Sequence, residues 1–415
     1  MIRTMTMRNH LPLLLWLLVV VVATAQDEED DLSPHEQQLA QVKWLREQGG
    51  FFSDKLGFQP PDDVSSSGGI YALQDLKEGE LLMKIPKHAQ MGPPEGQPPN
   101  RCPTALRLAK AYAYEEPEFW PYVQYVFEVF PHHTVPSAWT EEGKLLVRNI
   151  MANIEPNDFG DLGFFQECGP AFVEGQPEEV LEYADAALRI VRARAWIHYL
   201  VPVYDMGNHA NGHLHNMDQR EDSQIQPDIE VIALRNVQKG EELSLSYNEC
   251  NDWTCNGQKY EYTTAFLFNE YGFIERYSGS QRWSFYTSQD EETDFGKIVV
   301  EIHLAKDQPP SENNFTQPAL ELFVVQGTLG EDEIQWLSIQ QRRLEGIREW
   351  VYYQAALLEQ DFERDGALTL YEALLTAIRL SVEKGTSMLE PSTRDEREIG
   401  VDGASTRLSE ETVSA

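Results

Sequence analysis

The segment Val201-Pro-Val-Tyr-Asp-Met-Gly-Asn-His209 opens a stretch, closed by Tyr271-Gly-Phe273, in which polar groups gather at the ends of apolar runs. Between them lies Leu243-Ser-Leu-Ser-Tyr247, whose apolar and aromatic residues alternate as in a half-buried strand. This alternation places the Tyr247 phenol on the buried face, at the end of the strand. A buried tyrosine hydroxyl needs a hydrogen-bond partner, so Tyr247 is either satisfied within the fold or directed into a pocket.

A short pattern occurs twice in the chain, about 160 residues apart. Ala72-Leu73 followed by Gly79-Glu80-Leu81 matches Ala233-Leu234 followed by Gly240-Glu-Glu-Leu243. Each copy is typical of a strand, a turn and a second strand, so we predict two hairpins, one over 70–85 and one over 229–247. Two similar units this far apart indicate one β core interrupted by an insertion.

Helical periodicity occupies the rest of the chain. We predict a helix over 34–50, a helical insertion ending in a long amphipathic helix over 178–199, and two late helices over 331–363 and 367–385. Mixed strand and loop precede the late helices. The predicted order is a signal peptide (1–25), an acidic leader (26–33), an N-terminal β segment (34–92), the insertion (93–199), a C-terminal β segment (200–275), a helical domain (276–390) and a disordered tail (391–415).

The N-terminus is typical of a secretory signal peptide. Arg3 and Arg8 precede the apolar run 11–22, and Ala23-Thr-Ala25 matches a cleavage site. The run is shorter than the roughly 20 residues that a membrane span needs. We therefore expect secretion or residence in the endoplasmic reticulum lumen, without a membrane span after cleavage; an uncleaved signal anchor is the alternative.

The charge balance is strongly acidic, with 68 Asp and Glu against 33 Lys and Arg and a net charge of −35. Such a surface repels phosphate backbones and argues against nucleic-acid binding. It suits a soluble protein, which we expect to be a monomer, and it favours cationic partners.

The cysteine count fits an oxidising compartment. Cys102, Cys168, Cys250 and Cys255 allow two disulfides in three connectivities, and Cys250 and Cys255 are close enough in sequence to pair locally. Asn314 begins the sequon Asn-Phe-Thr and is a candidate glycosylation site.

A histidine cluster raises the question of a metal. His209, His213 and His215, with Cys250 and Cys255 nearby, match no structural zinc spacing, so we predict no metal site. A metal-dependent hydrolase using these histidines remains a competing class.

The combination of motifs resembles the SET-domain protein methyltransferases, in the branch that includes the Rubisco large-subunit methyltransferase and the actin histidine methyltransferase. The resemblance covers most of residues 34–275. It is carried, in chain order, by Lys43-Trp-Leu-Arg-Glu-Gln-Gly-Gly-Phe-Phe52, by Gly69-Ile-Tyr-Ala-Leu-Gln-Asp-Leu-Lys-Glu-Gly-Glu-Leu-Leu-Met-Lys-Ile-Pro86, by Phe119-Trp-Pro-Tyr122, Pro136-Ser-Ala-Trp139 and Arg194-Ala-Trp196, and by Asp205-Met-Gly-Asn-His209, Gly240-Glu-Glu-Leu-Ser-Leu-Ser-Tyr247 and Tyr271-Gly-Phe273.

The resemblance implies an α+β fold, with a SET-type core of small β-sheets, a pseudoknot, a helical insertion and a C-terminal helical domain (276–390) at the position of the family's substrate-binding domain. It also implies that S-adenosylmethionine binds beside Gly69, Ile70, Arg194, Asn208 and His209, with Arg194 facing the cofactor's carboxylate.

The same resemblance implies a catalytic role for Tyr247, at a channel lined by Tyr204, Tyr271 and Phe273. The expected activity is methyl transfer to a lysine of a protein substrate, with histidine as an alternative acceptor. Three positions depart from the family pattern: Gly68, Ala210 and Asn248. A non-catalytic SET-like module that binds a peptide or protein is therefore the second hypothesis.

Overall fold

The computed structural model describes residues 32–59, 68–130, 132–154, 163–196, 198–211, 214–220, 228–247, 263–275, 280–286, 297–304 and 320–389. Outside them lie the predicted signal peptide and tail and residues 26–31 of the leader, together with His213, Asn248, Cys250, Cys255 and Asn314. In the part of the chain that is described, no helix is both long enough and apolar enough to cross a membrane. The chain divides into two compact units, residues 1–144 with 158–279 and residues 145–157 with 280–415.

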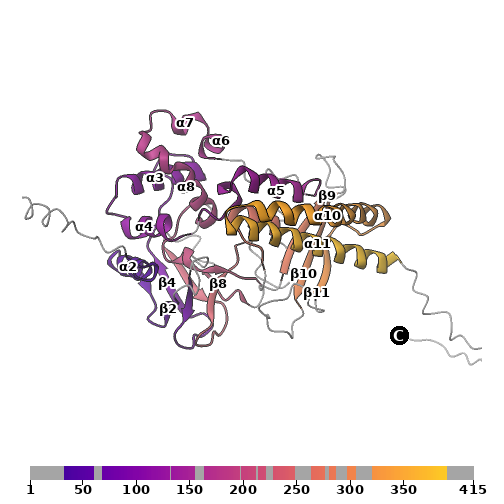
Figure 1. Ribbon diagram of the computed structural model, residues 1–415. Helices are drawn as coiled ribbons and strands as arrows, with labels where there is room; N and C mark the ends of the chain where they lie inside the picture. The colour runs from indigo at the N-terminus through magenta and orange to yellow at the C-terminus, as the bar shows by residue number, and fades with distance from the viewer. Residues whose placement is uncertain are drawn as a thin grey trace, which may run out of the picture. The chain divides into compact units, whose positions relative to one another are not determined.

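The first unit contains two four-stranded sheets (Figure 1). One has the order β1 (Phe51–Phe52), β4 (Leu81–Ile85), β7 (Ile229–Ala233) and β6 (Met217–Gln219). The other has the order β2 (Leu56–Gln59), β3 (Gly69–Ala72), β8 (Glu242–Leu245) and β5 (Asn208–His209). Neighbouring strands are antiparallel except β5 and β8, which are parallel. Each sheet therefore combines strands from before and after the helical insertion, which confirms the predicted α+β class with a split core of small sheets; the pseudoknot stays a prediction.

The two predicted hairpins are wrong as pairings. β3 pairs with β8 and β4 pairs with β7, so the strands of each sequence copy lie in different sheets. The copies bond to each other instead: Leu76 and Val237 exchange both backbone hydrogen bonds, at 2.9 and 3.1 Å. The connection in each copy is longer than the two to five residues of a tight hairpin, so it can lie along its counterpart rather than fold back.

The contact between the two copies is close to two-fold symmetric. The Gly79 amide donates to the Ala233 carbonyl (2.8 Å), and the Gly240 amide donates to the Ala72 carbonyl (2.7 Å). Side chains repeat the relation: the Glu78 amide donates to Asn236 Oδ1, and the Lys239 amide donates to Asp75 Oδ1. The sequence offset that relates Leu76 to Val237 relates every one of these pairs. The repeated motif is therefore a self-complementary seam.

Helices α3 (Arg101–Ala113), α4 (Trp120–Glu128), α6 (Phe164–Cys168), α7 (Pro170–Val173) and α8 (Glu178–Arg194) form the predicted insertion within the first unit. They are joined there by α2 (Pro34–Glu47), α9 (Thr264–Tyr271) and the 3₁₀ turns Lys87–Ala89, Pro136–Ala138 and Tyr204–Met206; α5 (Glu141–Met151) crosses from one unit to the other. Helix α2 begins at a capping box, in which Ser33 and Glu36 bond to each other's backbone amides. Helix α8 begins and ends within the predicted 178–199 pattern, and its apolar face packs on α3.

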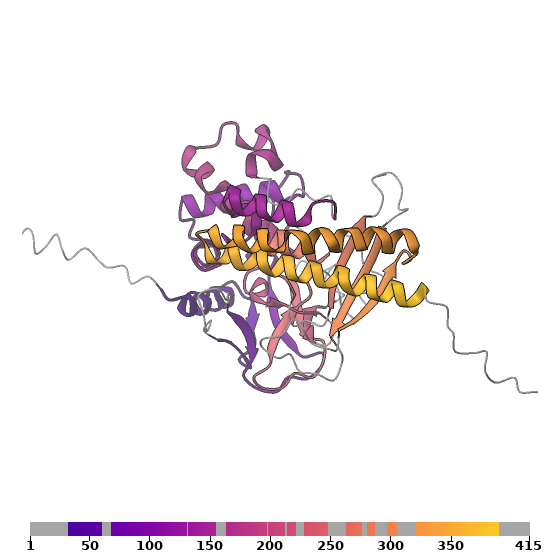
Figure 2. The same ribbon diagram turned by 45° about the vertical axis from the view of Figure 1, so that its right-hand side comes forward.

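The second unit combines a sheet with two long helices. Strands β9 (Ser280–Tyr286), β10 (Lys297–Leu304) and β11 (Leu320–Gln326) are antiparallel in the order β11-β10-β9. Helices α10 (Glu331–Leu357) and α11 (Asp361–Leu389) run side by side (Figure 2). The first late helix was predicted to reach 363. It ends earlier because Leu358 adopts an extended backbone and buries its side chain, so the second helix starts at Asp361.

Candidate functional site

The parallel pairing of β5 with β8 brings Asn208-His209 beside the end of β8, two residues before Tyr247. Asn208 lies opposite Ser244, and His209 lies opposite Leu245. The Tyr247 hydroxyl donates a 2.6 Å hydrogen bond to the Gly207 carbonyl, and its backbone amide donates to His209 Nδ1 at 3.0 Å. Both ends of the tyrosine are thus fixed by the β5 segment.

Aromatic rings surround the Tyr247 phenol. Its ring centroid lies 4.8 Å from Tyr271, 5.2 Å from His209 and 6.3 Å from Phe273. Burial raises the pKa of Tyr247, so the phenol stays protonated at neutral pH. The structure brings these four predicted residues together. We call His209, Tyr247, Tyr271 and Phe273 the aromatic cluster.

Tyr204, the remaining predicted channel residue, bonds to a different partner. Its hydroxyl donates to Asp218 Oδ1 at 3.3 Å. Burial, followed by the nearby Asp218 carboxylate, raises the pKa of Tyr204 well above the usual value. Tyr204 is thus held by strand β6, on which Asp218 lies.

The predicted cofactor loop packs against Asn208. Asn208 Nδ2 donates to Glu242 Oε1 (2.6 Å) and to the Gly68 carbonyl (3.3 Å). A Cβ on Gly69 would lie 3.0 Å from Asn208 Nδ2 and closer still to Glu242 Oε1, so only glycine fits without moving them. The Ile70 side chain is fully buried in the core, so any contact of Ile70 with a ligand involves its backbone.

Glu242 is an acid that sequence reasoning missed. Burial raises its pKa, and the hydrogen bond from Asn208 opposes that rise. It follows Gly240-Glu241, in a turn where carboxylates are normally solvated. In the sequence, the alternation with buried Leu243 predicts a solvent-exposed side chain at Glu242, so the pattern gives no indication that this acid is buried.

Arg194 is buried and already paired within the protein. Its Nη1 donates to the Asp205 carbonyl at 2.7 Å and lies 3.4 Å from Asp205 Oδ1, while the guanidinium stacks 4.1 Å from the Phe130 ring centroid. Burial alone would lower the pKa of Arg194, but Asp205 and the surrounding tyrosines raise it above the usual value. Tyr122, which sequence reasoning also missed, completes the group by donating to Asp205 Oδ2 at 2.6 Å. A ligand carboxylate would therefore share this guanidinium with Asp205.

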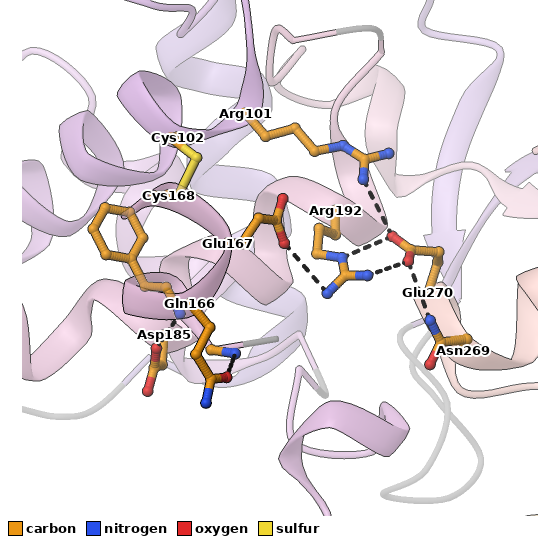
Figure 3. Close-up of polar contacts among 11 residues, drawn as sticks. Arg101, Cys102, Gln166, Glu167, Cys168, Asp185, Arg192, Asn269 and Glu270 are labelled. Carbon is orange, nitrogen blue, oxygen red and sulfur yellow. Dashed lines mark hydrogen bonds and ion pairs between the residues drawn. A yellow bond between two sulfur atoms is a disulfide. The ribbon is translucent and has the colours of Figure 1, made fainter. Parts of the chain in front are cut away.

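Charged residues hold helix α9, which carries Tyr271 (Figure 3). Arg192 on α8 donates through Nε to Glu270 Oε2 at 3.0 Å and lies 3.6 Å from Glu167. Arg101 Nη1 lies 3.5 Å from the same Glu270 carboxylate. Only 4% of the Glu270 side chain is exposed, so removing its arginine partners would leave an uncompensated buried charge. They fix the helix turn from which Tyr271 reaches the aromatic cluster.

A disulfide lies beside this charge network. Cys102, next to Arg101, is bonded to Cys168, next to Glu167 (Figure 3). This bond excludes two of the three connectivities that the sequence allows. If the protein has a second disulfide, it pairs Cys250 with Cys255. That second pair stays a prediction.

The histidine cluster is only partly within the described residues. His215 is buried, with Nε2 3.1 Å from the Met217 carbonyl, and His209 belongs to the aromatic cluster, while His213 is outside. No group of three or more His, Cys, Asp or Glu side chains placed to hold a metal occurs among the described residues.

Comparison with known proteins finds one matching family model. Residues 68–248 match the SET domain, the family that the motifs predict. No curated protein sequence matches the chain. The solved structure of Rubisco LSMT bound to AdoMet is similar, with a TM-score of 0.47 and 14% identity over 86% of this chain and 92% of that one. The SET domain of LSMT bound to lysine and AdoHcy is similar with a TM-score of 0.45 and 15% identity, over 86% and 90%.

Proposed function

We propose that this SET-domain protein is an S-adenosylmethionine-dependent methyltransferase that acts on a lysine side chain of a protein substrate. The observation that carries the proposal is the Tyr247 phenol, protonated, bonded to the Gly207 carbonyl and enclosed by the aromatic cluster. Solved SET-domain structures with AdoMet or with lysine and AdoHcy support the choice of cofactor and acceptor.

The residues present fit such a cofactor. Gly69 lets the loop backbone approach Asn208 and Glu242, with whose side chains a Cβ would collide, so the backbone groups of this loop lie close to the Asn208 amide. Backbone groups of Gly69, Ile70, Asn208 and His209 would hold the cofactor, and Arg194 would face its carboxylate while remaining paired with Asp205. When bound, the cofactor supplies a methyl group on a positively charged sulfur.

Tyr247 contributes alignment rather than proton transfer. Its hydroxyl hydrogen is used on Gly207, so the oxygen lone pairs are free to accept from an acceptor amine or to stabilise positive charge. The faces of Tyr271 and Phe273 favour a cationic or polarised amine beside them. Because the raised pKa keeps the Tyr247 phenol protonated, no phenolate is present to accept a proton, and the lysine proton leaves to solvent before transfer. The site then works mainly by holding the amine in line with the methyl group.

The net charge of −35 supports a basic substrate segment. The signal-peptide pattern and the Cys102–Cys168 disulfide support a location in the secretory pathway, secreted or lumenal. A signal anchor is the alternative location. A histidine acceptor is the alternative chemistry.

A non-catalytic peptide-binding module is the competing function. The observation that favours it is the pairing of Arg194 with Asp205, which leaves the guanidinium charge already neutralised. Titration with S-adenosylmethionine by calorimetry separates the two, because absence of binding at millimolar cofactor refutes the enzyme.

Substitution of Tyr247 tests the mechanism. Tyr247→Phe should lower the rate of methyl transfer by about 100-fold, since one positioned polar group is lost, while cofactor affinity changes by less than about twofold. The matched control is Tyr371→Phe, which removes another buried hydroxyl, one that donates to the Leu344 carbonyl at 2.9 Å in the second unit.

Mass spectrometry of lumenal and cell-surface proteins incubated with the enzyme identifies the acceptor. An unchanged rate and product pattern in Tyr247→Phe contradicts the role given to the phenol.

A further inference from the structure

The ring of His209 has a defined orientation. Its Nδ1 accepts the backbone amide of Tyr247 at 3.0 Å, so Nδ1 carries the lone pair and a neutral ring has its proton on Nε2. Only 3% of the His209 side chain is exposed. Within the described residues Nε2 makes no hydrogen bond, but the carboxylate of Glu275 lies 3.5 Å away.

Glu275 is held in that place by other buried groups. Thr264 Oγ1 donates to Glu275 Oε2 at 2.5 Å, and Asn211 Nδ2 donates to Oε1 at 3.2 Å. Asn211 in turn accepts from Ser246 Oγ at 2.7 Å, so the residue preceding Tyr247 belongs to the same network. Thr264, Asn211 and Glu275 are all at most 5% exposed. The network therefore joins the start of helix α9 to the Ser246 side chain and, through His209, to the Tyr247 backbone amide.

We propose that Glu275 is a positioning residue that acts through His209 to set the place of the Tyr247 phenol. The proposal rests on the proposed function, in which Tyr247 aligns the acceptor. A carboxylate facing Nε2 favours the tautomer with hydrogen on Nε2, and that tautomer leaves Nδ1 to accept the Tyr247 amide. The opposite tautomer would point an N–H at that amide and push the strand end away.

Glu275 lies outside the residues that match the SET domain, so its effect can be tested separately from cofactor binding. Glu275 lies after residue 248, where the family match ends, and its contacts with Thr264 and Asn211 hold it from outside the proposed cofactor residues. Loss of the Glu275 carboxylate should therefore lower kcat for methyl transfer without weakening cofactor binding. Displacing a reacting group by about 1 Å costs up to about 100-fold in rate.

The test compares Glu275→Leu with Glu275→Gln in the full-length protein. The control is Glu301→Gln, which disrupts a buried ion pair with Arg282 in the second unit. Protein labelled with ¹⁵N-histidine reports the tautomer of His209, whose signal is identified by its loss in His209→Asn. Turnover is measured with labelled S-adenosylmethionine and poly-L-lysine, and cofactor affinity by calorimetry.

We expect Glu275→Leu to lose the Nε2–H tautomer and about 10- to 100-fold in kcat, with cofactor affinity unchanged. Glu275→Gln should keep the tautomer and most of kcat, because its amide oxygen still accepts from Nε2. The proposal is overturned if Glu275→Leu keeps the tautomer, or if its kcat falls no further than that of Glu301→Gln.

Inactive wild-type protein would count against the proposed function on this acceptor, and the positioning claim is then decided by the spectra. A changed His209 tautomer together with a shifted Tyr247 amide in Glu275→Leu supports it. Unchanged signals at both positions refute it.

Discussion

Removal of the Cys102–Cys168 disulfide should destabilise the first unit strongly. The bond joins the first turn of α3 to the last residue of α6, across a sequence separation of 66. Cross-linking a loop of this length removes unfolded-state entropy equivalent to about 4 kcal/mol at 25 °C. A typical domain is stable by only about 5–15 kcal/mol, so this is a large share.

The double variant Cys102→Ser/Cys168→Ser is the suitable perturbation, because a single substitution leaves a free thiol able to attack the other cysteines. Urea unfolding followed by circular dichroism should show a loss of about 4 kcal/mol, or somewhat less where the unfolded chain stays compact. The adjacent contacts of Arg101 with Glu270 and of Glu167 with Arg192 should loosen as well.

Cys250→Ser/Cys255→Ser is the matched control. These cysteines are five residues apart, so their predicted bond is worth only about 2 kcal/mol by the same relation. A loss below about 1 kcal/mol for the 102/168 pair, or a larger loss for the control, would show that loop closure is not the source of stability.

Two further changes test the site loop and the insertion. Gly69→Ala should leave the protein folded, because the flexible end of Glu242 can move. The added methyl group should nevertheless break the hydrogen bond from Asn208 to Glu242 and weaken cofactor binding about tenfold, as measured by calorimetry. The control Gly346→Ala, in α10 with open space around it, should instead stabilise the fold by about 0.5–1 kcal/mol, and equal cofactor affinities in the two variants would refute the role given to Gly69. Burial lowers the pKa of His132 to about 4, below its unfolded value of about 6.5, so the folded state should lose up to about 3 kcal/mol as pH falls from 6.5 to 4. His132→Gln should flatten that part of the stability-against-pH curve, and a curve parallel to wild type contradicts the burial of this ring.

The sequence indicates element types better than it indicates partners. The strands around Ala72 and Ala233 were predicted at the right positions, but their pairing was not, because alternation and turn residues do not specify which strand supplies the missing hydrogen bonds. The helix starts were readable, since Ser33 with Glu36 is a local signal. The end of α10 was not, because it depends on where Leu358 finds a buried site.

The same division holds at the site. The structure brings Tyr247, His209, Tyr271 and Phe273 together, and the sequence had singled out all four because each follows or ends a recognisable motif. Glu242, Glu275 and Tyr122 were missed. Their importance comes from burial beside groups far away in the chain, and an acid or a phenol in isolation gives no sign of such a partner.

The seam between Leu76 and Val237 also constrains how the chain reaches its native state. Strand β4 leaves the ribosome long before β7, its main hydrogen-bonding partner, and β3, which pairs on one edge with β2, leaves long before β8 arrives at its other edge. Contacts of such sequence separation slow folding and leave strand edges exposed to association meanwhile. The helices of the insertion, built from local contacts, can form during that interval and bring the two halves together. The contact between the two copies of the repeated motif can therefore form only after both copies have been synthesised, which makes it a late step in folding.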